Sequence, residues 1–253
     1  MGNPSLKSDF DRDGFVVIRQ FLADAKLNEL RTNLDRYIVD VVPQLSDADA
    51  IYDDKSRPDT LKQMQRIEKH DPFFGDYLHN SLWVTIAEQL FGEDVLAPSG
   101  FEWFDKPPRT NHPTPPHQDN FYFCLTPPRV LTMWLALDDV DEETGCLRYV
   151  PGSHLRGLRP HNRTRTLGFS QGISDYTDQD RAQEIPIPAA PGDVLIHLGN
   201  TIHRADRNGS LDRHRRSFGI VIQARSCVRD ESAFEKYLHA SREQHQEMGL
   251  KTL

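Results

Sequence analysis

The first part of the chain, up to about residue 95, spaces its apolar side chains as helices do. A short β run at Phe15–Ile18 comes first. A helix is expected to begin at Ala23 and Asp24, because apolar residues then recur every three or four positions, which places them on one helical face. The residues of that face are Leu27, Leu30, Leu34, Tyr37 and Ile38. The spacing therefore predicts an amphipathic helix directly after a short strand.

Further helices are expected before residue 95. In the polar stretch that follows, the pattern predicts a helix only around Leu61–Lys69. Residues 71–94 predict one or two helices closed by Gly92, since glycine is favoured at helix ends. Their common apolar face is expected to hold Leu82, Ile86 and Leu90.

After about residue 95 the pattern changes to short β-rich runs separated by proline, glycine and aspartate. Such runs occur at 95–104, 117–125, 129–140, 145–153, 183–189, 192–199 and 215–225. Many short strands at this spacing are typical of a β-sandwich or jelly-roll barrel. The second part of the chain is therefore expected to be mainly β.

Two other segments complete the expected architecture. The polar stretch 156–180 predicts a long loop of the kind that acts as a lid, mobile without ligands and closing over them. The tail at 231–250 predicts a terminal helix. One domain is expected over 1–253. Its parts are a helical region at 1–95 packed on the barrel, a jelly-roll core at 96–227 and a C-terminal helix at 228–253.

The composition agrees with a globular protein and argues against several functions. The 253 residues are 37% hydrophobic and 9% aromatic, enough for one large core. A net charge of −8 argues against generic binding to nucleic acid or anionic membranes. The chain shows neither a signal pattern nor the roughly 18 consecutive apolar residues of a membrane span. Three cysteines without paired spacing indicate free thiols, so we expect a cytoplasmic protein. We further expect a monomer or dimer that acts on a small molecule.

The stretch "TPPHQDNFYFCL" at 114–125 holds a candidate metal-binding pair. In a strand, side chains at i and i+2 share a face, so His117 and Asp119 are expected to project together into the barrel mouth while Gln118 points away. This short motif alone is weak evidence of a metal, and a third ligand is required. Three loop histidines are expected in solvent instead: His112, His161 and His214.

The third ligand is expected within residues 191–225. His203 follows a turn, whereas His197 falls in mid-strand and stays the alternative. Two imidazoles and one carboxylate form a facial triad, which suits non-haem Fe(II) that also binds an oxidant and a co-substrate. Arg215 begins an apolar strand, and a guanidinium inside a barrel requires an anion such as the far carboxylate of 2-oxoglutarate. Strand alternation lets only one of two adjacent arginines face inward, so Arg216 stays the alternative.

Together these residues resemble the phytanoyl-CoA dioxygenase family of Fe(II)- and 2-oxoglutarate-dependent oxygenases. The resemblance spans nearly the whole chain and rests on an ordered set of motifs. These are "DGFVVIRQFL" near the start, "KPP" at 106–108, "HQD" at 117–119, "WLALDDVDEETGCLRYVPGSH" at 134–154, "PGDVLIHLGNTIHRADRN" at 191–208 and "RRSF" from 215.

The resemblance implies a double-stranded β-helix, cupin-like, wrapped by N-terminal helices. The implied iron ligands are His117, Asp119 and His203. It further implies that Arg215 anchors 2-oxoglutarate and that Trp134 lies along the co-substrate pocket. The family usually has a hydroxyl residue two positions after the distal histidine; here that position is Ala205, and Thr132 is the expected substitute. Because Asp119 is present, the resemblance implies hydroxylation of an aliphatic carbon with O2, releasing succinate and CO2, rather than halogenation.

Substrate contacts are expected from segments near the metal. The candidates are Gln63, Gln65, Glu102 and Asn120. Four arginines make the 156–180 stretch basic, which favours an anionic substrate such as a carboxylate, a phosphonate or a CoA thioester. These are Arg156, Arg159, Arg163 and Arg165. A metal-dependent isomerase or hydrolase that does not use 2-oxoglutarate is the alternative function, although it leaves Arg215 without an anion.

Overall fold

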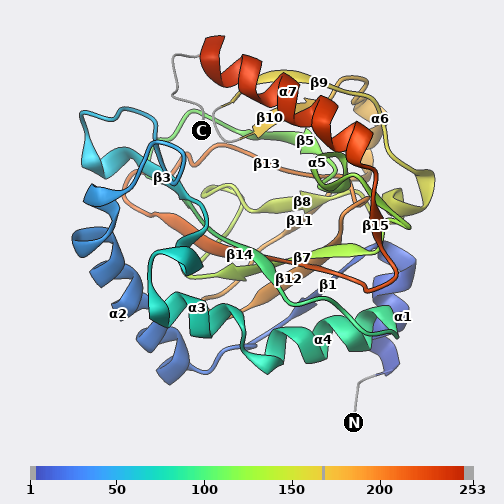
Figure 1. Cartoon of the computed structure of the whole chain (residues 1–253), viewed down its shortest axis with the longest axis horizontal. Coiled ribbons are helices and arrows are strands. Elements are labelled where there is room, and N and C mark those ends of the chain that lie inside the picture. The colour runs from blue at the N-terminus through green and yellow to red at the C-terminus, as the bar shows by residue number, and fades with distance from the viewer. Residues whose placement is uncertain (1–3, 167–168, 248–253) are drawn as a thin grey trace.

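A computed structural model describes residues 4–166 and 169–247 (Figure 1). Its centre is a pair of antiparallel β-sheets. The larger sheet has the strand order β1-β12-β7-β14-β4-β3-β2. Its strands are β1 (Phe15–Ile18), β12 (Val194–Leu198), β7 (Val130–Ala136), β14 (Arg215–Gln223), β4 (Ser99–Lys106), β3 (Leu61–Met64) and β2 (Ala50–Tyr52).

The smaller sheet lies across from the larger one, and its strand order is β11-β8-β13-β5 (Figure 1). Its strands are β11 (Ile185–Ile187), β8 (Leu147–Tyr149), β13 (His203–Ala205) and β5 (Thr114–His117). Two short pairings complete the β structure: β9 (His161–Thr166) with β10 (Phe169–Ile173), and β6 (Leu125–Thr126) with β15 (Val228–Arg229). The predicted mainly-β class with a jelly-roll core is confirmed.

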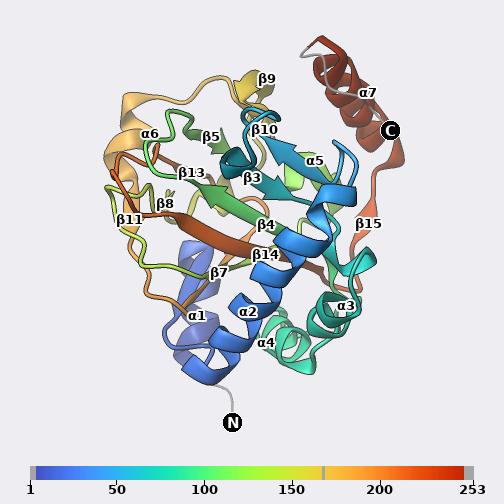
Figure 2. The same ribbon diagram turned by 90° about the vertical axis from the view of Figure 1, so that its left-hand side faces the viewer.

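Helices flank the two sheets on opposite sides. The N-terminal helices α1 (Pro4–Asp13), α2 (Asp24–Asp40), α3 (Pro72–Leu78) and α4 (Ser81–Phe91) lie beneath the larger sheet, whereas α7 (Glu231–Glu247) lies at the other end (Figure 2). Shorter helical segments are η1 (Val42–Gln44), η2 (Pro58–Thr60), η3 (Ile67–Lys69), α5 (Asn120–Phe123), η4 (Ser153–Arg156) and α6 (Asp178–Gln183). Among the described helices, none is both long and apolar enough to cross a membrane.

Helix α2 confirms the predicted apolar stripe. Leu27, Leu30, Leu34 and Tyr37 are buried, and Ile38 packs partly buried beside them. Burying a leucine side chain stabilises the fold by roughly 2 kcal/mol, so this face adds several kcal/mol to the main core cluster. The predicted strand at β1 is also confirmed, and it joins the edge of the larger sheet by pairing with β12.

The predicted helix over Leu61–Lys69 is wrong. Leu61–Met64 forms β3, which pairs with both β2 and β4, and only Ile67–Lys69 forms a short 3-10 turn. The available sheet edge offers backbone hydrogen bonds on both sides of this segment, and such tertiary pairing overrides weak helix propensity. The pairing sets Gln63 opposite Phe104 of β4, which brings it to the interior of the barrel.

Two details of the N-terminal helices differ from the predictions. Helix α1 was not expected from the pattern. In α4 the face is rotated: Leu82 is 39% exposed because the large indole of Trp83 takes the buried position and packs on Phe21 and Tyr77. The buried residues of α4 are Trp83, Ala87, Leu90 and Phe91. Gly92 ends this helix in the left-handed conformation, as predicted.

Residues 156–180 are more structured than the predicted loop. They include the β9–β10 hairpin, which packs beside β5, and the beginning of α6. Helix α6 starts with a capping box in which Thr177 and Asp180 bond to each other's backbone N–H groups. Residues 167–168 lie outside the described residues. The predicted C-terminal helix is confirmed as α7, and positions 248–250 of the expected tail also lie outside the described residues.

Candidate active site and metal centre

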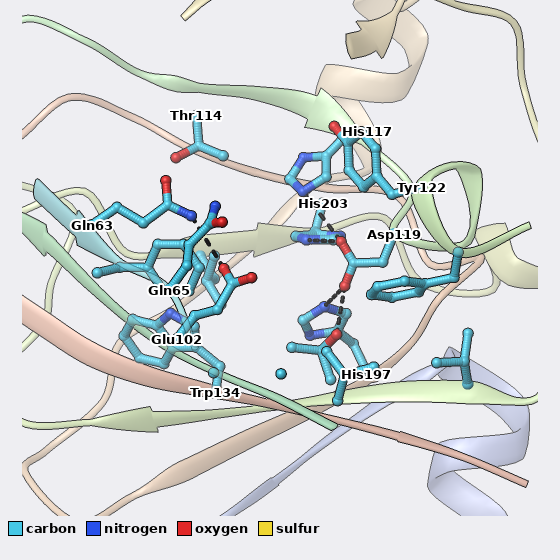
Figure 3. A pocket seen from close by; sticks show the side chains of 18 of the residues that line it. Gln63, Gln65, Glu102, Thr114, His117, Asp119, Tyr122, Trp134, His197 and His203 are labelled. Carbon is cyan, nitrogen blue, oxygen red and sulfur yellow. Dashed lines mark hydrogen bonds and ion pairs between the residues drawn. The ribbon is translucent and has the colours of Figure 1, made fainter. Parts of the chain in front are cut away.

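Three candidate metal ligands meet inside the barrel mouth. His117 ends β5, His203 begins β13, and Asp119 stands just before α5 (Figure 3). The Nε2 atoms of His117 and His203 lie 3.4 and 3.6 Å from Asp119 Oδ1, and the three donor atoms lie within 4.8 Å of one another. Neighbouring ligands of an octahedral ion with bonds of about 2.1 Å are roughly 3 Å apart, so this set fits one ion after small movements.

Backbone carbonyls decide which nitrogen of each imidazole faces Asp119. His117 Nδ1 lies 2.8 Å from Pro115 O, and His203 Nδ1 lies 3.0 Å from Thr201 O. A carbonyl oxygen only accepts, so each Nδ1 carries a proton, and Nε2 is the nitrogen that each ring presents to Asp119. Burial and the two neighbouring imidazoles lower the pKa of His203 well below its usual value. This histidine is therefore neutral, as metal ligation requires.

Asp119 is held by two donors on its second carboxylate oxygen. Thr132 Oγ1 donates to Oδ2 at 2.6 Å, and His197 Nε2 lies 3.1 Å from the same atom. Because His197 donates its Nε2–H to Asp119 in a hydrogen bond, its Nδ1 is the acceptor, and the Tyr149 hydroxyl donates to it at 2.9 Å. Burial acts to raise the pKa of Asp119, but the surrounding imidazoles, His203 first, lower it well below its usual range. Asp119 is thus ionised, and Oδ1 is left for a cation.

The sequence-based reason for pairing His117 with Asp119 is wrong, although the two do meet. Asp119 has helical backbone angles, φ −59° and ψ −34°, and is not in a strand. The chain turns at Gln118, whose buried amide donates to Gly157 O at 2.9 Å and Asn200 O at 2.7 Å. A helical turn, rather than strand alternation, therefore brings the two ligands together.

Arg215 occupies another wall of the same space. It is 3% exposed, its Nε donates to Gly145 O at 3.2 Å, and its guanidinium carbon lies 5.3 Å from the centre of the Trp134 ring. Burial lowers the pKa of Arg215 to about 10, and no carboxylate of the described residues forms an ion pair with it. Arg216 instead pairs with Asp138 at 2.8 Å. Of the two arginines, Arg215 faces the interior and lacks an anion.

Lys106 is a neighbour of Arg215 to which the sequence assigns no role beyond the "KPP" motif. The register of β4 and β14 pairs the two residues directly, and Lys106 is also buried. Its Nζ donates to Asp206 O at 2.6 Å and to Ala205 O at 3.4 Å. Burial, and then the charge of Arg215, lower the pKa of Lys106 well below its usual value. Two buried basic side chains together make this wall a site for an anion.

A cavity of about 490 Å³ joins the metal ligands, this anion site and the surface. Gln63, Gln65 and Glu102 all line it, as the sequence predicts (Figure 3). Gln63 Nε2 donates to Glu102 Oε2 at 3.1 Å. Burial raises the pKa of Glu102 to about 7. Helix α7 contributes to the same cavity through Phe234, Tyr237 and Leu238.

Asn120 and Thr132 do not take the positions expected of them. Asn120 is 2% exposed and closes a turn, because its amide both donates to Leu125 O and accepts from Leu125 N at 3.1 Å. It is not among the residues that line the cavity. The Thr132 hydroxyl lies on Asp119 instead of at Arg215, so it supports the metal ligand and does not replace the hydroxyl missing at Ala205.

The basic stretch 156–180 does not make a basic cavity. Arg159 forms ion pairs with Asp175 and Asp180, and Arg163 forms one with Glu243. Arg156 donates to the side-chain amide of Gln183. The side chain of Arg165 lies outside the described residues. Since the described arginines already have partners, the reason for expecting an anionic substrate falls away.

One of the three loop histidines differs from expectation. His161 is only 9% exposed and stacks on Phe121 with ring centres 4.1 Å apart. Its Nε2 accepts from Gln118 N at 3.2 Å. His112 and His214 are exposed, as expected; His214 also bonds to the buried Asp105 at 2.8 Å, and His112 stands at the edge of the cavity. Packing against residues distant in sequence, which a local pattern does not reveal, buries His161.

A jelly roll that holds two histidines, an aspartate and a buried anion site at its mouth has the architecture of non-haem iron oxygenases. The sequence agrees with that class: the family model described as phytanoyl-CoA dioxygenase (PhyH) matches residues 10–217. The chain belongs to the phytanoyl-CoA dioxygenase family.

Curated relatives show the same family at low identity. Phytanoyl-CoA dioxygenase domain-containing protein 1 of Mus musculus is 27% identical over 161 residues, which cover 62% of this chain and 54% of the relative. Its Caenorhabditis elegans homolog is 23% identical over 265 residues, covering 87% of this chain and 90% of the relative. Phytanoyl-CoA dioxygenase 1 of Oryza sativa subsp. japonica is 32% identical over 109 residues, covering 42% of this chain and 38% of the relative. The chain thus spans about half the length of the mouse relative and less of the rice one.

Solved structures share the fold. The alpha ketoglutarate-dependent carbocyclase SnoK from nogalamycin biosynthesis has a TM-score of 0.72 at 24% identity, covering 94% of this chain and 90% of SnoK. The epimerase SnoN, in complex with Fe3+, alpha ketoglutarate and nogalamycin RO, has a TM-score of 0.70 at 23% identity, covering 89% and 84%. EctD from S. alaskensis, with 2-oxoglutarate and 5-hydroxyectoine, has a TM-score of 0.70 at 19% identity, covering 88% and 76%.

Proposed function

We propose that the protein is an Fe(II)- and 2-oxoglutarate-dependent dioxygenase that hydroxylates an aliphatic carbon of a small molecule. The observation that carries the proposal is the cavity that joins two imidazoles and an ionised carboxylate to a buried guanidinium that pairs with no described carboxylate. A cation site and a carboxylate site within one enclosed space are what a ferrous ion and 2-oxoglutarate require.

The side chains present fit both groups. His117 Nε2, His203 Nε2 and Asp119 Oδ1 would hold the iron, because each has a free electron pair directed to the same point. Arg215, with Lys106 beside it, would bind the distal carboxylate of 2-oxoglutarate, and Trp134 would lie along the co-substrate. When bound together with O2, the iron and 2-oxoglutarate supply the oxidant that removes hydrogen from an unactivated carbon, and succinate and CO2 are released.

The protein itself orients these groups and excludes water. Thr132 and His197 hold Asp119 Oδ2, so the carboxylate cannot rotate without losing two hydrogen bonds. Apolar side chains also line the cavity, and they would help to exclude water from a bound substrate. These are Phe104, Leu125, Val130, Leu147 and Val221. A substrate would lie against Gln63, Gln65 and Glu102 on the remaining side.

The buried Arg215 also argues against the alternative function. An isomerase or hydrolase that does not use 2-oxoglutarate would leave a buried guanidinium without an anion, at a cost of several kcal/mol. Structures of this fold include an epimerase and a carbocyclase, so oxidation can end in products other than an alcohol. The presence of 5-hydroxyectoine in the EctD structure supports hydroxylation as the outcome to test first.

An anaerobic titration with Fe(II), with and without 2-oxoglutarate, tests the proposal. The weak visible charge-transfer band of the chelate is expected in the wild type and absent in His203→Ala. Arg215→Ala is expected to raise the 2-oxoglutarate concentration for half-saturation by about 100-fold or more, because paired charge-assisted hydrogen bonds are lost. Arg216→Ala is the matched control, since it removes the neighbouring arginine that pairs with Asp138 outside the cavity. Bound iron without a band in the wild type would overturn the proposal.

The outcome of the reaction needs a second measurement. Once a substrate is known, incorporation of one oxygen atom from ¹⁸O2 into the product supports hydroxylation. A product formed with succinate release but without that atom would identify a desaturation, epimerisation or ring closure instead.

A further inference from the structure

Glu102 is an acid in the same cavity as the basic pair. It lies on the same strand as Lys106, four residues away, so both side chains face the interior and their backbones are about 13 Å apart. Figure 3 shows the Glu102 carboxylate directed toward the space in front of Asp119, with Gln63 and Gln65 beside it. The anion site and this acid therefore lie at separate points along the same wall of the cavity.

No described cation neutralises Glu102. The charged groups that act on it are Asp119 and Glu68, which raise its pKa, and Arg66, which lowers it. Arg66 is already paired with Asp49 at 2.7 Å. The other base on this side of the cavity, Lys62, is likewise paired, with Asp53 at 2.9 Å.

Among the described residues, one neutral group donates a hydrogen bond to the Glu102 carboxylate. Gln63 Nε2 donates to Oε2, which leaves Oε1 of Glu102 and the amide oxygen of Gln63 to accept from a ligand. Burial is the main reason that the pKa of Glu102 rises to about 7. A partly buried carboxylate without a cationic partner is stabilised by a cation that binds beside it.

Aromatic rings line the same cavity as Glu102. Phe104 is two residues from Glu102 on β4 and faces the same cavity, together with Tyr122 and Trp134 (Figure 3). The faces of aromatic rings attract ammonium groups. An ammonium group also has three donors and no acceptor, which matches the acceptor oxygens of Glu102 and Gln63.

We propose that the substrate carries a protonated amine, which Glu102 and Gln63 bind so that the carbon chain of the substrate extends over the iron site. This inference rests on the proposed function, because it names the substrate class for the same cavity. It replaces the anionic substrate favoured by the sequence, whose described arginines have other partners. The distance between Glu102, which binds the amine, and the metal ligand Asp119 would decide how far from the amine the oxidised carbon lies.

The test compares ligands of equal length and different charge: n-hexylamine, n-hexanol and hexanoate. Each is titrated into the anaerobic complex of the protein with Fe(II) and 2-oxoglutarate, and the shift of the visible band reports occupation of the cavity. Calorimetric titration of the metal-free protein with n-hexylamine runs in parallel. The variants are Glu102→Gln, which keeps the shape and the amide contact, and Asp53→Asn, which removes a different carboxylate that lines the cavity.

The expected result is that n-hexylamine binds the wild type and Asp53→Asn alike, and binds Glu102→Gln roughly 10- to 100-fold more weakly, the range for losing a hydrogen bond to a charged group. The alcohol and the acid are expected to bind the wild type at least tenfold more weakly than the amine, and n-hexanol is expected to show no difference between wild type and Glu102→Gln.

Any one of three results would overturn the inference. These are equal binding of n-hexylamine and n-hexanol by the wild type, amine binding by Glu102→Gln as tight as by the wild type, and no amine binding up to the solubility limit. A missing band with iron and 2-oxoglutarate would instead overturn the proposed function. In that case, calorimetry on the metal-free protein still decides whether Glu102 binds an amine.

Discussion

Replacing Thr132 by valine tests whether a neutral hydroxyl positions the carboxylate ligand of the metal. Valine has nearly the same shape but lacks the donor that lies 2.6 Å from Asp119 Oδ2. The register of β7 and β12 pairs Thr132 with His197, so two adjacent strands present their donors to the same oxygen. In Thr132→Val only the His197 donor, at 3.1 Å, remains.

The expected loss follows from the strength of that hydrogen bond. A hydrogen bond to an ionised group contributes about 1.5–3 kcal/mol. The metal affinity changes only by the difference in the free energy of this hydrogen bond between the metal-bound and the metal-free protein. Removal of a group that hydrogen-bonds to a metal ligand typically weakens metal binding by about 10- to 100-fold. Because His197 still holds Oδ2, the lower end of that range, about tenfold or roughly 1.4 kcal/mol, is expected for Thr132→Val.

The assay is an anaerobic competition titration of Fe(II) against a chelator of known affinity. Thr132→Ser is the matched control, because it keeps the hydroxyl and removes a methyl group, and it should bind iron within about threefold of the wild type. Unfolding midpoints in urea show whether either variant has lost stability. Wild-type iron affinity in Thr132→Val, or equal losses in the valine and serine variants, would refute the role given to this hydroxyl.

Two further predictions concern stability. Burial lowers the pKa of His161 to about 4, and its Nε2 accepts from Gln118 N, so the folded state keeps it neutral. Because the unfolded chain takes up the proton first, stability present above about pH 6.5 is lost as the pH falls toward 4, by about 1–2 kcal/mol at pH 5. Urea unfolding of the metal-free protein at several pH values measures this, and a His161→Gln variant with the same slope would contradict it. Gly145 has φ +80°, and a Cβ there would overlap Asp206 O, so Gly145→Ala should lower the free energy of unfolding by more than about 2 kcal/mol. Gly100→Ala, at φ +72° with open space around it, should lose clearly less, and equal losses would show that backbone conformation alone matters.

Local pattern was sufficient for much of the fold and for the residue types of the candidate metal site. The stripe of α2 and the short strands after residue 95 follow from spacing within a few residues, because burial on one face of a helix or strand imposes a period. The two histidines and the aspartate are recognisable for a related reason: few other residue types bind a divalent ion, so a small number of side chains carries the signal.

Only the tertiary structure decided how these pieces act. The polar segment Leu61–Met64 became a strand because a sheet edge lay beside it, and Asp119 reached His117 through a helical turn stabilised by the distant Gly157 and Asn200. Thr132 turned out to support the metal ligand because β12 places His197 beside it.

The same holds for charge, which matters most for the substrate. The sequence shows basic residues at 156–180 and a single glutamate in β4, and by count alone the basic residues dominate. In the folded protein Arg159 and Arg163 are neutralised by carboxylates from other segments, whereas no described cation reaches Glu102. A charged side chain attracts a ligand only if no opposite charge of the protein already neutralises it. The partners that neutralise it come from segments distant in sequence, which a local pattern does not reveal.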